Sequence, residues 1–305
     1  MSSTVITDDT LYLGVDGGGT KCRACLVSSS GEILGVGLSG PANPLHGLTR
    51  TLASITEAAE QALESAAVSP AKMNEIIAGV ALAGINLPGM FAAMKEWQHP
   101  FAEMYLTTDL HAACLGAHRG GDGAVIVAGT GSCGFASVKG ESVTLGGHGF
   151  LLGDMGSGAW MGLEAIKAVL MAEDGLSGST ELVDKVTDIY GVDGLKIVET
   201  MSKASSSEFA RLAPSVLAAA VAGDEVATTI VKQGAGYIDR LAKKLLLLEP
   251  PRLSMLGGIS APLQKWLSAE VAEKVEQPLD QPEMGAVYFA RERHKERISQ
   301  VSAVV

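Results

Sequence analysis

A short segment near the N-terminus combines an acid, three glycines and a threonine in an order suited to binding a charged ligand. The segment consists of Asp16, Gly17, Gly18, Gly19, Thr20 and Lys21. Apolar stretches flank it, which predicts a strand, a turn that only glycines can make, and a second strand. Backbone N–H groups of such a loop can approach an anion, and a carboxylate at the strand end can hold Mg²⁺. Asp16 is therefore the candidate metal ligand, although an ordinary hairpin with a glycine-rich turn has the same pattern.

A second segment repeats this pattern about a hundred residues later. The apolar residues 124–128 lead into Gly129, Thr130, Gly131 and Ser132, and another apolar stretch follows at 135–138. Two strand–glycine-turn–strand units favour a duplicated fold, in which two loops could hold a polyphosphate from both sides. Only the first loop carries an acid, so we expect the two loops to have different roles.

Three common motifs do not explain these loops. Residues 129–134 match the G-x-G-x-x-G fingerprint of dinucleotide-binding proteins, but 135–140 are predicted to form a strand and a turn where that fingerprint needs a helix. The chain contains no G-x-x-x-x-G-K-[ST] segment, which excludes an NTPase of the Walker type. It contains no G-x-S-x-G segment either, so a Ser-His-Asp hydrolase is not supported.

Asp109 is the candidate general base. It follows a strand predicted at 104–107 and opens a helix predicted to run to His118. An Asp at this position can be a simple helix N-cap. The glycine loops, however, also follow strand ends, which is where open α/β sheets bind their ligands. A carboxylate there can accept the proton of an attacking hydroxyl group.

Three further polar residues lie in loops rich in glycine and proline, namely Asn43, His148 and Asp154. Each can form a hydrogen bond with a polyol, and each can equally be an ordinary turn residue. The histidines are not spaced as a metal cluster. Cys22 and Cys25 form a C-x-x-C pair inside a predicted strand, where positions three apart face opposite sides, so this pair is not expected to bind metal or form a disulfide.

Composition limits the function classes and the partners. The 305 residues include 23 Lys and Arg against 34 Asp and Glu, a net charge of −11, which argues against a nucleic-acid or anionic-membrane surface. The first ten residues are polar and acidic, which predicts no signal peptide, and no apolar stretch is long enough to span a membrane. We therefore expect a cytoplasmic protein.

The predicted order of elements indicates a mixed α/β fold. In residues 1–118 it is three strands, helix, strand, helix, strand, helix, and the beginning of this order recurs from residue 124. An all-helical insertion is predicted at 179–249. A strand at 252–256 and a last helix at 284–297 complete the chain.

Several of these motifs occur together, in the same order, in a known family. They are residues 16–21, 107–109, 129–132, 146–149 with 153–157, and Gly257 with Gly258. With them the chain resembles the group of N-acetylglucosamine kinases and bacterial glucosamine kinases over nearly its whole length. That group is classed with the activator ATPases of benzoyl-CoA reductase type, within the actin–hexokinase–Hsp70 superfamily.

The resemblance implies two ribonuclease-H-like domains, each a mixed five-stranded sheet flanked by helices, with ATP in the cleft between them. The first domain would be 1–118, completed by the C-terminal helix at 284–305. The second would be 119–283, with the helical insertion at 179–249. The resemblance also implies a homodimer.

By the same resemblance, Asp16 serves Mg²⁺ and Asp109 takes the proton from the 6-hydroxyl group of an amino sugar. Contacts with ATP are implied for Gly17, Gly18, Gly19, Thr20, Lys21, Thr130, Gly131, Gly257 and Gly258. Contacts with the sugar are implied for Asn43, Asp109, Ser132, Gly147, His148, Asp154 and Gly158.

Two departures bear on the substrate. The family usually has Trp where His148 stands and Glu where Met155 stands. Losing the Trp removes an apolar platform for a sugar face or its acetyl group. The motifs shared with the family nevertheless favour an ATP-dependent kinase of glucosamine or N-acetylglucosamine. The alternatives are a kinase of another hexose, an ATPase that drives a protein partner, and a sugar-sensing protein without catalysis.

Overall fold

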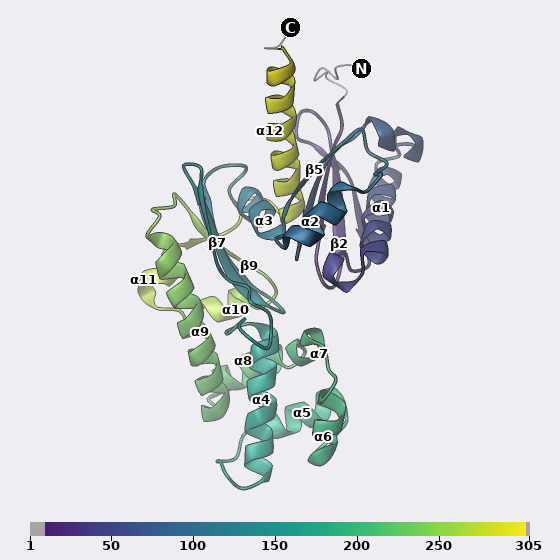
Figure 1. The fold of residues 1–305 in the computed structure, drawn as a ribbon. Coiled ribbons are helices and arrows are strands. Elements are labelled where there is room, and N and C mark those ends of the chain that lie inside the picture. Colours follow the sequence, from purple (N-terminus) through teal and green to yellow (C-terminus); the bar gives the residue numbers. More distant parts are fainter. Residues whose placement is uncertain (1–9, 303–305) are drawn as a thin grey trace. The chain divides into compact units, whose positions relative to one another are not determined.

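The computed structural model describes residues 10–302 (Figure 1). The N-terminal segment for which the sequence predicts no signal peptide lies outside this range, apart from Thr10. The chain forms two compact units, Met1–Asp122 with Pro278–Val305, and Gly123–Gln277. The domains expected from the sequence, 1–118 with 284–305 and 119–283, differ from these units by the short connecting segments.

The first unit is built on a five-stranded sheet in the order β3-β2-β1-β4-β5. Its strands are β1 Tyr12–Gly17, β2 Cys22–Val27, β3 Ile33–Ser39, β4 Ile77–Leu82 and β5 Glu103–Thr108. The first three strands pair antiparallel, as the predicted meander requires, while β4 and β5 run parallel to β1. The carboxyl ends of β1, β4 and β5 therefore lie at one edge of the sheet.

Helices cover both faces of this sheet (Figure 1). They are α1 Leu48–Ser65, α2 Pro88–Lys95, α3 Asp109–Ala117 and α12 Pro282–Ser302, with 3₁₀ helices at Pro44–His46 and Pro70–Glu75. Leu13 and Val15 of β1 share a core with Ile55 of α1. Tyr12 and Cys25 face the opposite side and pack against α12. Cys22 lies in the core on the α1 side, so the prediction that the C-x-x-C pair faces opposite sides is confirmed.

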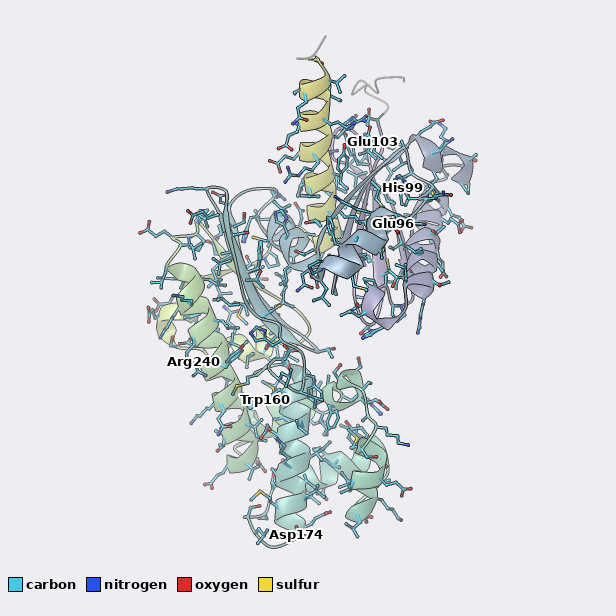
Figure 2. All side chains as sticks on the ribbon, in the orientation of Figure 1. Glu96, His99, Glu103, Trp160, Asp174 and Arg240 are labelled. Atoms are coloured by element: carbon cyan, nitrogen blue, oxygen red, sulfur yellow. The ribbon has the colours of Figure 1, made fainter. Side chains whose placement is uncertain are left out.

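Helix α12 returns from the end of the chain and lies directly on the sheet. A Cβ atom on Gly14 of β1 would sit 1.9 Å from the carbonyl oxygen of Glu283, so only glycine permits this approach. Near the other end of the helix, Glu103 of β5 accepts hydrogen bonds from His294 (2.9 Å) and from Arg297 (Figure 2). The first turn of α12 is thus held against β1, and its C-terminal half against β5.

The second unit repeats the sheet in the order β10-β9-β6-β7-β8. Its strands are β6 Gly123–Ala128, β7 Ser132–Val138, β8 Glu141–Gly146, β9 Leu253–Leu256 and β10 Val275–Glu276. Again three strands pair antiparallel and two add in parallel. The equivalent strand orders confirm the predicted duplication and the predicted fold class. Strand β10, only two residues long, was not predicted.

The predicted helical insertion is confirmed. The helices of this unit are α4 Gly158–Glu173, α5 Leu182–Tyr190, α6 Leu195–Met201, α7 Ser206–Ala210, α8 Ala213–Ala222, α9 Glu225–Leu246, α10 Ser260–Gln264 and α11 Ala269–Ala272. Ser205 and Glu208 form the expected capping box at α7, and Asp224 caps α9 by accepting from the N–H of Ala227. Trp160, in the first turn of α4, packs in the same core as α9 (Figure 2).

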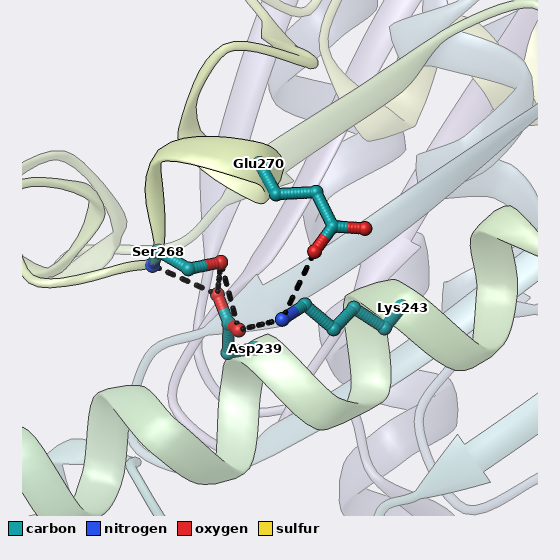
Figure 3. Close-up of polar contacts among 4 residues, drawn as sticks. All are labelled: Asp239, Lys243, Ser268 and Glu270. Atoms are coloured by element: carbon teal, nitrogen blue, oxygen red, sulfur yellow. Dashed lines mark hydrogen bonds and ion pairs between the residues drawn. The ribbon is translucent and has the colours of Figure 1, made fainter.

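A polar network ties α9 to the segment that ends at β10 (Figure 3). Asp239 accepts hydrogen bonds from the backbone N–H of Ser268 (3.0 Å) and from its hydroxyl group (2.8 Å). Lys243 forms ion pairs with Asp239 and Glu270. The pKa of Asp239 is lowered: the donors from Ser268 and Lys243 together outweigh the opposing effect of burial, which is the largest single contribution.

Between residues 10 and 302, no single helix is both long and apolar enough to cross a membrane. One bent pair, Ser206–Ala222 with Glu225–Leu246, could do so by length and composition alone.

Candidate active site

Asp16 lies near the carboxyl end of β1, half-buried beneath the first glycine loop. Its pKa is raised to about 7, first because burial disfavours the charged form and then because Asp109 and Glu283 add negative charge. Lys21 and Arg23 act in the opposite direction. Burial and the neighbouring acids disfavour the charged form of Asp16, and a cation beside it would stabilise that form. The metal assignment requires such a cation.

The first glycine loop presents its tip to solvent. The N–H of Gly18 donates to the carbonyl oxygen of Lys21 (3.0 Å), which closes the turn predicted between the two strands. Gly19, Thr20 and Lys21 are exposed, so a ligand can reach their backbone. The N–H of Ala42 donates to the Gly18 carbonyl (2.9 Å), which attaches the next loop to this one.

Asp109 begins α3 but is not its N-cap. The cap is Thr108, whose hydroxyl oxygen accepts from the N–H of His111 (3.1 Å). Asp109 is therefore not the N-cap residue, and the simple capping explanation for it is wrong. One carboxylate oxygen accepts from the N–H of Leu110 (2.9 Å). Burial raises the pKa of Asp109, as suits a proton acceptor, while this N–H and its own oppose the shift.

Asp16 and Asp109 belong to one cluster. In the parallel ladders Gly17 is level with Leu82, and Leu82 is level with Thr108, so both acids stand at the same sheet edge. The charge of Asp109 contributes to the raised pKa of Asp16. Two carboxylates at the carboxyl ends of parallel strands, next to a glycine loop, are what a phosphoryl-transfer site needs from this half of the protein.

Asn43 lies in the loop attached to Gly18. Its side-chain oxygen accepts from the N–H of Leu45 (3.0 Å) and so caps the short 3₁₀ helix Pro44–His46. This bond fixes the orientation of the amide beside the glycine loop. The expected turn role of Asn43 is present, and its side chain remains half-buried at the edge of the loop.

In the second unit, the loop of Gly129, Thr130 and Gly131 is fixed by backbone hydrogen bonds from two helices. The carbonyl oxygens of Gly129 and Thr130 accept from the N–H groups of Gly158 (2.8 Å) and Ala159 (3.2 Å), at the start of α4. Ile259, just before α10, donates to the carbonyl oxygen of Ala128 (3.2 Å). The segment with Gly257 and Gly258 therefore lies directly beside this loop.

Asp154 occupies a left-handed backbone conformation (φ 53°) in the glycine-rich loop after β8. Its carboxylate accepts from the N–H of Gly149 (3.3 Å), and the residue is 8% exposed. Burial raises the pKa of Asp154, and the N–H of Gly149 and the charge of His148 oppose this shift. His148 itself is exposed on the same loop, one residue after Gly147.

Ser132 and Gly158 have structural contacts of their own. The hydroxyl group of Ser132 donates to the carbonyl oxygen of Met155 (2.8 Å), and the residue is 2% exposed. A Cβ on Gly158 would lie 3.1 Å from the Gly129 oxygen, so this glycine keeps α4 close to the loop. Both contacts hold the loops in place.

Two residues that the sequence did not single out belong to the first cluster. Arg23 and Glu283 form an ion pair, and both affect the pKa of Asp16. Arg23 could have been found from its place opposite Asp16 in the predicted hairpin. Glu283 had no such signal, because an acid in the first turn of a helix is usually a surface residue.

The donor set around Asp16 suits Mg²⁺. No group of three His, Cys, Asp or Glu side chains that could hold a metal ion occurs within residues 10–302. Mg²⁺ is usually held by one or two carboxylates, water and the phosphates of a substrate, and Asp16 offers such a carboxylate.

The fold identifies the structural class of the protein. The duplicated sheets are those of the actin-like ATPases, and a glucokinase of the ROK family from Streptomyces griseus has the same fold (TM-score 0.54, 19% identity, 92% of this chain and 99% of that chain). A candidate N-acetylglucosamine kinase from Chromobacterium violaceum superposes with a TM-score of 0.88 at 29% identity, over 93% of this chain and all of that one.

Residues 13–290 match the model of the BadF/BadG/BcrA/BcrD ATPase family, and the chain belongs to that family. The nucleotide is therefore ATP. The chain is 37% identical to glucosamine kinase GspK of Vibrio cholerae over 92% of its length and 95% of that protein. It is 28% identical to N-acetyl-D-glucosamine kinase of Dictyostelium discoideum, over 77% and 80% of the two chains. The resemblance noted in the sequence is confirmed.

Proposed function

We propose that this protein is an ATP-dependent amino-sugar kinase, which transfers the γ-phosphoryl group to the 6-hydroxyl of glucosamine or N-acetylglucosamine. The observation that carries the proposal is the pair Asp16 and Asp109 at one sheet edge beside a glycine loop. The likeness to named amino-sugar kinases over nearly the whole chain supports the choice of acceptor.

In this proposal Asp109 is the general base. As the sugar oxygen forms its bond to the γ-phosphorus, the bond from phosphorus to the leaving oxygen of ADP breaks, and the hydroxyl proton passes to the Asp109 carboxylate. The hydrogen bond from Leu110 keeps one carboxylate oxygen fixed, so the other can face the hydroxyl group. The raised pKa favours proton acceptance at neutral pH.

Asp16 would hold Mg²⁺, which neutralises charge on the phosphates when it is bound. The phosphates would be held by the loop of Gly17, Gly18, Gly19, Thr20 and Lys21, and by Thr130 and Gly131. Adenosine would lie against Gly257 and Gly258. Loops rich in backbone N–H groups suit this role because phosphoryl transfer needs positioning and charge stabilisation above all.

We assign the sugar contacts to Asn43, Gly147, His148 and Asp154, together with Asp109. Ser132 and Gly158 support these loops instead, because Ser132 is buried on Met155 and Gly158 packs against Gly129. His148, exposed on the glycine-rich loop, replaces the apolar Trp usual in the family. A polar ring there fits an unacetylated amino sugar better than an acetylated one.

The finer parts of the proposal concern assembly and location. We place the enzyme in the cytoplasm as a homodimer. Light scattering of the purified chain tests the number of subunits, and a monomer would contradict that part.

The first test is ADP release with Mg-ATP against glucosamine, N-acetylglucosamine, glucose, N-acetylmannosamine and no sugar. We expect strong stimulation by glucosamine or N-acetylglucosamine. Turnover independent of sugar would instead favour an ATPase that drives a protein partner. That alternative is weakened by the cysteines, since Cys22, Cys25 and Cys114 are buried and therefore poorly placed to share a cluster with another subunit.

The base assignment is tested by Asp109→Asn, which keeps the acceptor for Leu110 and so the local fold. Transfer should fall at least about 100-fold while ADP binding stays unchanged. The matched control is Asp184→Asn, which removes an exposed carboxylate on α5. Near-normal transfer by Asp109→Asn would remove Asp109 from the role of base.

A further inference from the structure

Arg23 stands directly opposite Asp16 in the antiparallel ladder between β2 and β1. Side chains of such a pair lie on one face of the sheet with their Cβ atoms about 5 Å apart. A guanidinium group is therefore within easy reach of the Asp16 carboxylate. Arg and carboxylate form strong, often bidentate pairs, and such a pair would occupy the oxygens that a divalent cation needs.

The guanidinium group is instead engaged by Glu283. Its Nε donates to Glu283 Oε1 at 2.5 Å, and the Glu283 side chain is only 5% exposed against 42% for Arg23. A buried carboxylate is costly unless it is paired, so Glu283 holds its cation firmly.

Glu283 itself has a fixed place. Its backbone carbonyl lies on Gly14 of β1, where a Cβ would come within 1.9 Å. Two residues along α12, a Cβ on Gly285 would lie 1.8 Å from the carbonyl oxygen of Ala112 in α3. The first turn of α12 is thus in close contact with the strand that carries Asp16 and with the helix that begins at Asp109.

We propose that Glu283 is a positioning residue, which holds Arg23 away from Asp16 and so keeps the Asp16 carboxylate open to a divalent cation. This inference rests on the proposed role of Asp16 as the Mg²⁺ ligand. It gives the returning helix a part in the site in addition to its part in the core.

The test is a double-mutant cycle with Mn²⁺ as the probe, measured by electron paramagnetic resonance in the presence of ADP. The variants are Glu283→Met, Arg23→Met and the double variant, because Met fills the space without an acceptor or a charge. Glu283→Met should weaken Mn²⁺ binding about tenfold as Arg23 moves to Asp16. Arg23→Met should bind Mn²⁺ at least as tightly as the wild type, and the double variant should recover to within about twofold.

Two outcomes would overturn the inference. The first is wild-type Mn²⁺ binding by Glu283→Met. The second is weak binding that the double variant does not recover, which would mean that Glu283 only anchors α12. Arg297→Met is the matched control, since it removes another ion pair of α12, with Glu103, and should leave Mn²⁺ binding unchanged.

The failure of the proposed metal role would be visible separately. Asp16→Asn should abolish Mn²⁺ binding in this assay. If Asp16→Asn binds Mn²⁺ as the wild type does, the metal assignment is wrong, and the role of Glu283 with it. If it does not, the cycle above tests Glu283 alone.

Discussion

Gly131 faces the carboxylate of Asp154 so closely that a Cβ on the glycine would lie 2.7 Å from Asp154 Oδ2. Gly131 belongs to the proposed phosphate loop and Asp154 to the proposed sugar loop. The two loops are joined again through Ser132, whose carbonyl oxygen accepts from the N–H of Gly147 (3.1 Å). Within this unit, the proposed phosphate loop and the proposed sugar loop are therefore in direct contact.

The first prediction concerns Gly131→Ala. The added methyl group should displace the Asp154 carboxylate, because Asp154 is 8% exposed and has little room to move. We expect the KM for the sugar to rise about tenfold and kcat to fall, measured by steady-state kinetics with the sugar varied. In an Asp154→Ala background the same substitution should add little. A full additional loss in that background would show that the methyl group acts on the phosphate loop alone.

A second prediction compares two neighbouring glycines. Gly257 has φ 103°, and a Cβ there would lie 2.3 Å from the carbonyl oxygen of Ala128, so Gly257→Ala should cost roughly 2 kcal/mol or more in stability. A Cβ on Gly258 meets nothing within 4 Å. Gly258→Ala should therefore keep the melting temperature and raise the KM for ATP, because adenosine is proposed to lie there. An unchanged KM for ATP would move the adenosine elsewhere.

A third prediction follows from Asp16. Its pKa is about 7 in the folded protein against 3.8 in a free carboxyl group, so the folded state binds a proton more tightly than the unfolded state does. Stability without metal should fall as the pH rises from about 4 to about 7, by roughly 4 kcal/mol at most.

Asp16→Asn removes this effect. Thermal melts without metal should find the variant more stable than the wild type at pH 8, with the difference shrinking toward pH 5. Mg²⁺ with ADP should stabilise the wild type but not the variant. Equal melting curves at both pH values would mean that Asp16 ionises freely in the folded protein.

Much of the fold was predictable because its signals are local. Three helix starts carry a local signal: the capping box of Ser205 and Glu208, the N-cap Asp224, and Pro88 with its fixed φ. A helix begins at each of these places. The duplicated glycine turns likewise predicted two equivalent sheets. Strand β10 escaped prediction because two residues carry no periodicity.

The site was predictable only in part, because some of its features depend on distant contacts. Thr108 and Asp109 are both good capping residues, and the sequence does not tell which one turns inward to the first N–H groups of α3. Glu283 acquires its role only from packing on Arg23, which lies 260 positions away in the chain. Burial of Ser132 on Met155 also depends on loop packing.

The last prediction concerns His148, which is exposed on the glycine-rich loop where the family usually has Trp. His148→Trp would restore an apolar platform, and covering roughly 50 Å² of a sugar's apolar face or its acetyl group is worth about 1 kcal/mol. The KM for N-acetylglucosamine should therefore fall about fivefold while that for glucosamine changes less. Leu152→Trp is the control, because Leu152 is 88% exposed on the same loop and has no proposed contact with the sugar. If both variants shift the acetylated substrate equally, the effect comes from a more apolar loop in general, and His148 does not set the preference between the two sugars.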